Sequence, residues 1–304
     1  MTPQERHGVL WGALGVASFS LTLPATRAAV AHLDVGFVAI GRGLGAGLLA
    51  AVILWTTRQP VPRRSDLFSL CGVAAGVVIG FPFLTTLAMV HVPAAHGAIV
   101  VGLLPLSTAV AGVALAGERP SAGFWIVSLA GTAVLLAFIL DRAQGSVSAA
   151  DVALIGAVVS AAFGYALGGR LATRLGGWQV ICWALVVSLP FLALAALVLV
   201  EWPRASVPWS AWAGFAYVTL VSQLLGFFAW YHGLAIGGIA RVSQTQLLQL
   251  FMTLAASAVL LGERLDPRML TYGAAIVAIV AAGTRVRVNR DLHPARESKS
   301  RSSP

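Results

Sequence analysis

The sequence predicts an all-α membrane protein in which ten transmembrane helices form two inverted five-helix repeats. Of its 304 residues, 58% are apolar and 10% are charged, far below the roughly 25% charged share of a soluble domain. The charges cluster, and the windows between them, about 20 residues long, are each sufficient to cross about 30 Å of hydrocarbon. A helix with its stop signal also occurs twice in the chain, which predicts the two halves.

The predicted spans are these apolar windows, taken in chain order. All are expected to be helical, because lipid offers no partner for the open edge of a strand. The two repeats are expected at residues 1–145 and 146–287, and residues 288–304, which are basic and rich in Ser, are expected to be a disordered cytoplasmic tail. The ten spans are predicted at residues 8–26, 35–57, 67–89, 93–116, 121–140, 150–171, 177–200, 209–232, 239–261 and 268–285.

The fourth and ninth spans carry the repeat. Residues 103–119 have the sequence LLPLSTAVAGVALAGER and residues 248–264 have LQLFMTLAASAVLLGER, so Thr108 corresponds to Thr253. Both copies end in a Gly suited to terminating a helix, and the Glu-Arg pair that follows is expected to form a hydrated ion pair. Because five is an odd number of spans, the second half is predicted to enter the membrane from the opposite side, an arrangement suited to alternating access.

The basic residues predict that both termini are cytoplasmic. With the N-terminus inside, fourteen Lys and Arg residues lie in inside segments and five outside, which is the excess that cytoplasmic loops carry. The net charge of +9 is distributed over short loops and the tail, which suits anionic lipid headgroups and argues against nucleic acid as a partner. Cys71 and Cys182 fall in apolar runs, so no disulfide is expected.

Three neighbouring segments of the first half, VPAAHGAIV, LLPLSTAVAGVALAGE and FWIVSLAGTAVLL, are repeated in pattern by IGGIARVSQTQLLQLFMTLAASAVLLGERLDPRMLTYGAAIVAIVAAG. This duplicated pattern resembles the EamA-type transporters of the drug/metabolite transporter superfamily. The resemblance implies a ten-helix carrier of the bacterial cell inner membrane, often an exporter of amino acids or related metabolites. The ninth span departs from the family pattern, because it carries Gln where the family is usually apolar or small and because the family's Ser-Pro is absent.

Arg42 is the sharpest candidate for substrate binding. It lies about four residues, or roughly 6 Å, from the middle of the second span, where an arginine costs on the order of 2.5–3.5 kcal/mol on insertion scales. A carboxylate ligand or a hydrated cavity would compensate for this cost. In the alternative, structural interpretation, Arg42 extends toward the interface or bonds backbone carbonyls.

Gln246 and Gln249 in the ninth span are predicted to orient the substrate. Together with Thr253 they are spaced i, i+3 and i+7 and share one face of a helix, and neutral amides bind a zwitterion without fixing its charge. Interhelical hydrogen bonding, worth about 0.6 kcal/mol per contact, is the alternative role. Thr108, the counterpart of Thr253, is a further candidate for substrate binding.

The eighth span adds Ser222 and Gln223, which lie near mid-depth and are candidate substrate ligands. Trp230 and Tyr231, farther along the same span, are expected at the membrane interface. His96 lies one turn inside the outer end of the fourth span and is included among the candidates, because it either titrates during transport or has a structural role.

The predicted function is secondary transport, with export of small metabolites by alternating access. The absence of a carboxylate from the middle of every predicted span favours neutral, zwitterionic or anionic cargo. The alternatives are an intramembrane enzyme acting on lipid and a non-transporting scaffold or sensor, although intramembrane chemistry needs clustered acid, base or metal-binding groups that the sequence does not present. We expect no enzyme activity, cofactor or metal; the expected partners are a small-molecule substrate and membrane lipid, and a homodimer is left open.

Overall fold

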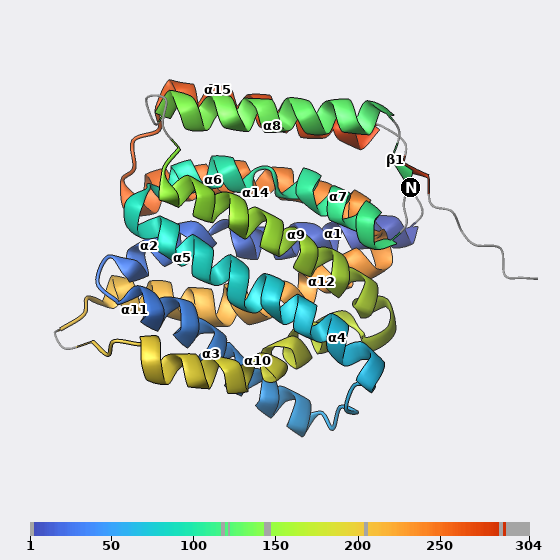
Figure 1. Cartoon of the computed structure of the whole chain (residues 1–304), viewed down its shortest axis with the longest axis vertical. Helices are drawn as coiled ribbons and strands as arrows, with labels where there is room; N and C mark the ends of the chain where they lie inside the picture. Colours follow the sequence, from blue (N-terminus) through green and yellow to red (C-terminus); the bar gives the residue numbers. More distant parts are fainter. Residues whose placement is uncertain are drawn as a thin grey trace, which may run out of the picture.

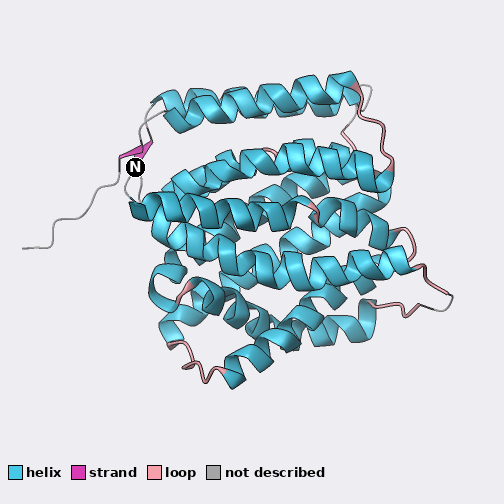
Figure 2. Cartoon of the chain, turned by 180° about the vertical axis from the view of Figure 1, so that it is seen from behind, coloured by secondary structure: helices cyan, strands magenta, loops and turns pink. Residues whose placement is uncertain are grey.

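Long helices run side by side across the whole molecule in the computed structural model (Figure 1). Seen from behind, the loops that join them lie mostly at the two ends of the helices (Figure 2). The structure describes residues 3–116, 119–120, 122–142, 147–203, 206–285 and 288–289.

The elements of the first half are α1 (Pro3–Ser20), α2 (Thr22–Val30), α3 (Val35–Thr56), α4 (Arg64–Val73), the π-helical segment η1 (Ala74–Gly80), α5 (Phe81–His91), α6 (Ala94–Val101), α7 (Leu104–Ala116), β1 (Arg119–Pro120) and α8 (Ala122–Arg142). Those of the second half are α9 (Ala149–Leu175), α10 (Gly177–Leu199), α11 (Trp209–Ala216), the π-helical segment η2 (Tyr217–Leu225), α12 (Gly226–Gly237), α13 (Ile239–Val242), the 3-10 turn η3 (Ser243–Thr245), α14 (Gln246–Leu261), α15 (Pro267–Arg285) and β2 (Val288–Asn289).

Within the described residues, eight helical segments are long and apolar enough to cross a membrane, so the chain is a multi-pass membrane protein. They overlap the first to fourth and the sixth to ninth predicted spans. The helices α8 and α15 occupy the positions of the fifth and tenth spans. The count of ten spans and the inverted arrangement of the halves therefore stay predictions.

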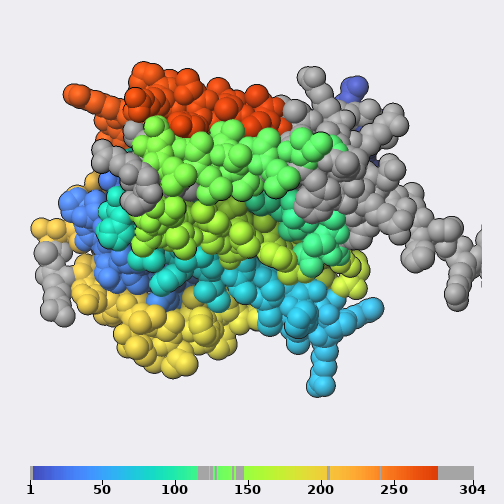
Figure 3. Space-filling model, turned by 45° about the horizontal axis from the view of Figure 1, so that its top comes forward, coloured from blue at the N-terminus to red at the C-terminus, as the bar shows by residue number. Residues whose placement is uncertain are grey.

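Neighbouring elements in the bundle come largely from opposite halves of the chain. Helix α1 packs against α12, and α9 packs against α5 and η1; α3 packs against α10. The pair formed by α8 and α15 covers one face of the molecule (Figure 3). This exchange of partners between the halves is the packing that two related, interlocked repeats would produce.

One short strand pair lies outside the helical bundle. In it, Arg119 of β1 is opposite Asn289 of β2, and Pro120 is opposite Val288. The described spans are helical as predicted, and the strand pairing joins Val288 and Asn289, which are predicted to begin the tail, to β1. The physical reason is that β1 precedes α8 and β2 follows α15, and these two helices pack on each other. The remainder of the predicted tail lies outside the described residues.

The first transmembrane segment is interrupted at Leu21, between α1 and α2. Pro24 has no N–H, so the Ser20 carbonyl, four residues earlier, loses its helical donor. The hydroxyl of Thr253 donates to that carbonyl at 2.7 Å. A side chain of α14 thereby satisfies the backbone group that the break in the first segment exposes, which is required in a membrane interior.

The two π-helical segments occupy similar positions in the two halves, since η1 begins at residue 74 and η2 at residue 217. In η1 the Phe81 N–H donates to the Gly76 carbonyl, and the next donor in this pattern would be Pro82, which has no N–H. The Val77 carbonyl accepts instead from Gln223 Nε2 at 3.0 Å. A side chain of η2 thus replaces the missing hydrogen bond of η1 and joins the two segments.

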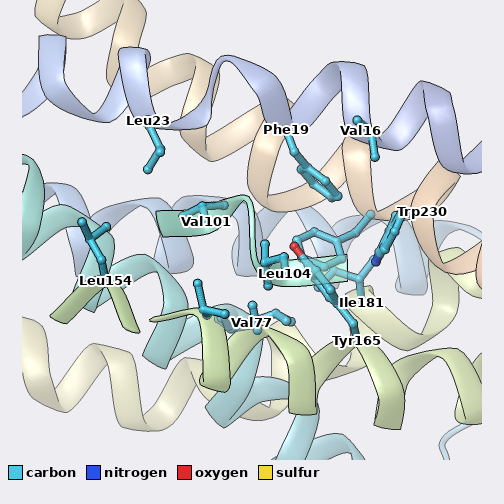
Figure 4. Packing of buried hydrophobic residues seen from close by; sticks show 14 of the residues in the cluster. Val16, Phe19, Leu23, Val77, Val101, Leu104, Leu154, Tyr165, Ile181 and Trp230 are labelled. Carbon is cyan, nitrogen blue, oxygen red and sulfur yellow. The ribbon is translucent and has the colours of Figure 1, made fainter. Parts of the chain in front are cut away.

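Aromatic side chains from three helices form the centre of the core, among them Phe19, Tyr165 and Trp230 (Figure 4). The expectation that Trp230 and Tyr231 lie at the membrane interface is wrong, because both are fully buried. The Tyr231 hydroxyl donates to the Gly164 carbonyl at 3.0 Å, and a Cβ on Gly168 would lie 2.3 Å from the Tyr231 ring. Gly168 of α9 therefore leaves the space that the buried Tyr231 ring fills.

Candidate functional site

A cavity with about 280 Å³ of empty space lies at the centre of the bundle. We call it the central cavity. Its walls come from both halves of the chain and combine one cation, several neutral polar groups and four aromatic rings. The lining residues are Phe19, Thr22, Arg42, Val77, Phe81, Tyr165, Ser222, Gln223, Phe227 and Gln249.

Arg42, on α3, supplies the positive charge of the central cavity. Its side chain is 1% exposed, and Nη2 donates to Ser222 Oγ at 3.2 Å. Its Nε and Nη1 atoms have no hydrogen-bond partner among the described residues. The described lining includes no acidic side chain, so the buried guanidinium charge is not neutralised within it. An anion entering the cavity would find unpartnered N–H groups on two nitrogen atoms and an unopposed charge.

Ser222 and Gln223 bring η2 to the same cavity. The Ser222 hydroxyl lies 2.8 Å from that of Thr22 and also accepts from Arg42, so it holds the guanidinium beside α2. Gln223 donates through Nε2 to the Val77 carbonyl, while its Oε1 has no partner in the described part of the chain. The free oxygen is an acceptor within the lining of a cavity whose main charge is positive.

A second, smaller space, which we call the side cavity, has about 200 Å³ of empty volume next to α14. Gln246, Gln249 and Thr253 line it together, so the three residues share the predicted face. Gln249 also lines the central cavity and therefore separates the two spaces. The other lining residues are Leu23, Ala98, Val101, Gly102 and Leu250.

Thr108 and His96 lie outside the lining of both cavities. Thr108 is fully buried on α7, and its hydroxyl has no partner among the residues described. His96 is buried on α6, where its Nε2 lies 2.7 Å from Asp151 Oδ1. The structure therefore groups four of the seven candidates, Arg42, Ser222, Gln223 and Gln249, around the central cavity, with Gln246 in the side cavity.

Asp151, which sequence analysis missed, holds His96 from the first turn of α9. Its Oδ2 accepts from the Ser148 N–H at 3.0 Å and from the Ser148 hydroxyl at 2.6 Å, and the Ser148 hydroxyl accepts in return from the Asp151 N–H. This is a capping box, and the Ser-x-x-Asp pattern before an apolar run was the signal that could have found it. Thr22 and Tyr165 of the central cavity were also missed.

Glu263 joins several helices at the same end of the bundle. Its carboxylate accepts from the Ala94 N–H at 2.8 Å and from the Ala95 N–H at 2.9 Å, so it caps the start of α6. It also lies 3.4 Å from Arg27 Nε, and Arg27 Nη1 donates to the Met89 and Val92 carbonyls at 2.7 and 2.6 Å.

The sequence predicted a hydrated ion pair between Glu263 and Arg264. In the structure, the Glu263 carboxylate instead contacts groups on other helices. The helix end itself is as predicted, because Gly262 terminates α14 with a φ of 65°. Its counterpart Glu118 lies outside the described residues. We call Arg27, His96, Asp151 and Glu263 the end cluster. The helices α6 and α9 begin at the opposite end of the bundle from the start of α1 (Figure 1).

These features define a helical membrane protein with a cationic, partly unsatisfied cavity at the middle of its helices. Comparison of the sequence with protein families identifies it further. The chain belongs to the EamA-like transporter family, whose model matches residues 6–140 and again residues 148–284. The resemblance inferred from the duplicated pattern is confirmed.

Two related proteins and one solved structure are also similar to most of this chain. An uncharacterized transporter, YdeK, of Bacillus subtilis (strain 168) is 45% identical over 281 residues, covering 92% of this chain and 97% of the relative. A probable terminal-alkyne amino-acid exporter of Streptantibioticus cattleyicolor is 28% identical over 91% of this chain and 93% of its own length. A solved crystal structure has a similar fold, with a TM-score of 0.63 at 19% identity over 91% of this chain and 96% of that one.

Proposed function

We propose that this chain is a secondary transporter that exports small metabolites bearing a carboxylate, such as amino acids, across the cell inner membrane. It works by alternating access between two inverted five-helix halves, with both termini cytoplasmic. The observation that carries the proposal is the buried guanidinium of Arg42, which has two unpartnered nitrogen atoms and no acidic neighbour in the described lining.

A substrate carboxylate is the group that this guanidinium lacks. Burying a charge without a partner costs several kcal/mol, and a carboxylate can accept two parallel hydrogen bonds from one guanidinium. The free Oε1 atom of Gln223 can accept from an ammonium group of the same solute. The family supports movement across the membrane, and the name of the more distant relative supports amino acids as the class of cargo.

The small size of the central cavity supports a site whose surrounding helices move when a substrate binds. Its empty space of about 280 Å³ has room for only about one water molecule, so a bound solute requires the helices around it to separate. The segments that surround the cavity are interrupted at Leu21, at η1 and at η2. Such interruptions permit helices to bend on either side of a central site.

Transport by the full-length protein in proteoliposomes tests the proposal. We expect Arg42→Ala to abolish uptake of labelled amino acids while the variant still reaches the membrane, and Arg42→Lys to keep part of the uptake, because lysine retains the charge without the planar pair of donors. Arg58→Ala is the matched control, since Arg58 is exposed at the end of α3. Normal transport by Arg42→Ala would reject the assignment.

A further inference from the structure

The side cavity contains polar atoms that carboxylate binding by Arg42 does not use. Gln246 is 2% exposed, yet neither its Oε1 nor its Nε2 has a hydrogen-bond partner within the described residues. The Oε1 of Gln249, at the boundary with the central cavity, is unpartnered in the same sense. Each unsatisfied buried group costs about 1–3 kcal/mol. Three such atoms around one space indicate that the space receives a hydrogen-bonding group.

The walls of the side cavity restrict the chemistry of that group. Leu23, Ala98, Val101 and Leu250 are apolar, and the described lining contains no charged side chain. An ionised group would lose its hydration there without gaining a counter-charge, so the bound group must be neutral. The Thr253 hydroxyl already donates to the Ser20 carbonyl, which leaves the two glutamines as the principal hydrogen-bonding groups.

We propose that the side cavity binds the neutral side chain of the transported amino acid, and that its preferred ligand group is a primary carboxamide. A carboxamide has one carbonyl acceptor and two N–H donors. The acceptor matches Gln246 Nε2, one N–H matches Gln246 Oε1 in a reciprocal amide pair, and the second N–H matches Gln249 Oε1. The inference rests on the proposed function, in which Arg42 holds the carboxylate of the same molecule.

The shared boundary between the two cavities restricts the length of the substrate. Gln249 lines both spaces, so a molecule bound to Arg42 reaches Gln246 by passing this residue. The side cavity has about 200 Å³ of empty space, less than the central cavity, so its ligand group is short and enters as the helices separate. Glutamine fits this description, whereas norleucine has similar length without polar atoms, and glutamate places a charge where the cavity has no cation.

Thermal unfolding of the purified full-length protein, titrated with each of these three amino acids, measures their apparent affinities, because a ligand of the folded state raises its stability. We expect glutamine to bind about tenfold more tightly than norleucine or glutamate, since one satisfied buried hydrogen bond corresponds to about that factor. Gln246→Leu should remove this preference while norleucine binds as before. Gln246→Met serves the same purpose if the leucine variant does not fold. Gln244→Leu, on the neighbouring turn and outside both linings, should keep the preference.

Two outcomes separate this inference from the proposed function. If Gln246→Leu leaves the ratio of glutamine to norleucine affinity unchanged, while Arg42→Gln abolishes binding of both, then the side cavity holds only water and the inference fails alone. If Arg42→Gln binds the amino acids as the unmodified protein does, the proposed function fails. If no amino acid stabilises the unmodified protein, both fail together.

Discussion

The centre of the bundle and its end cluster are both polar, and Arg27 and Glu263 of the end cluster are partly exposed. The two regions differ in how completely their hydrogen bonds are made. In the end cluster, Glu263 uses its two carboxylate oxygens on the N–H groups of Ala94 and Ala95, and Asp151 uses both of its oxygens on His96 and Ser148. At the centre, Arg42 and Gln246 each leave two polar side-chain atoms without a partner among the described residues.

This difference indicates that the end cluster serves stability and that the centre of the bundle serves binding. A fully satisfied polar network holds its elements in one arrangement, because breaking any member leaves another group unpaired. An unsatisfied group lowers the stability of the empty protein, and a ligand that pairs with it recovers that free energy. We therefore expect substitutions in the end cluster to change stability, and substitutions at the unsatisfied central atoms to change affinity and transport.

The largest loss of stability is expected from Asp151→Ala. Removing this carboxylate deletes the capping box of α9 and leaves His96 buried without its partner. Losing a hydrogen bond to a charged group costs about 1.5–3 kcal/mol, and losing the helix cap costs about 1 kcal/mol more. Unfolding of the purified variant should show a clear fall in Tm.

The matched control for that variant is Asp141→Ala. Asp141 is an exposed acid whose contact with Arg268, at 3.5 Å, lies on the surface, and such pairs contribute about 0–1 kcal/mol. Equal Tm values for Asp151→Ala and the unmodified protein would contradict the assignment of the end cluster to stability.

Glu263→Gln should have an intermediate effect. The amide keeps one acceptor oxygen for the start of α6 but loses the second, together with the charge that faces Arg27. Hydrogen bonds to charged groups contribute about 1.5–3 kcal/mol, so we expect a loss in the lower part of that range. Tm in detergent solution measures it, and Arg264→Gln, which changes the exposed neighbouring residue, should leave Tm unchanged.

The sequence predicted more of the central site than of the end cluster. The depth of Arg42 in its span and the i, i+3, i+7 spacing of Gln246, Gln249 and Thr253 are properties of single helices, so they are visible in one sequence. Family membership followed from a pattern that occurs twice and was therefore specific.

Contacts between distant segments were not predictable in the same way. His96 and Asp151 are 55 residues apart, and Glu263 reaches α6 across 169 residues, so neither pairing is visible in local spacing. Trp230 and Tyr231 were predicted at the interface because the position of a residue along a span indicates its depth in the membrane. That position does not indicate whether the side chain faces the lipid or the protein interior. The burial of Tyr231, for example, depends on the space left by Gly168 in another helix.

The smallest expected effect, and the sharpest test of the comparison, comes from Thr253→Val. Thr253 lies in the lining of the side cavity, beside the unsatisfied glutamines, but its hydroxyl is used on the Ser20 carbonyl that Pro24 leaves without a donor. The nearly isosteric valine removes only this hydrogen bond, so we expect a loss of about 1 kcal/mol in stability and an unchanged ratio of glutamine to norleucine affinity. Gln246→Leu, two turns away on the same face of α14, should instead change the ratio of glutamine to norleucine affinity and leave the stability nearly unchanged. A change of ligand preference in Thr253→Val would mean that satisfied and unsatisfied groups in the centre do not have separate roles.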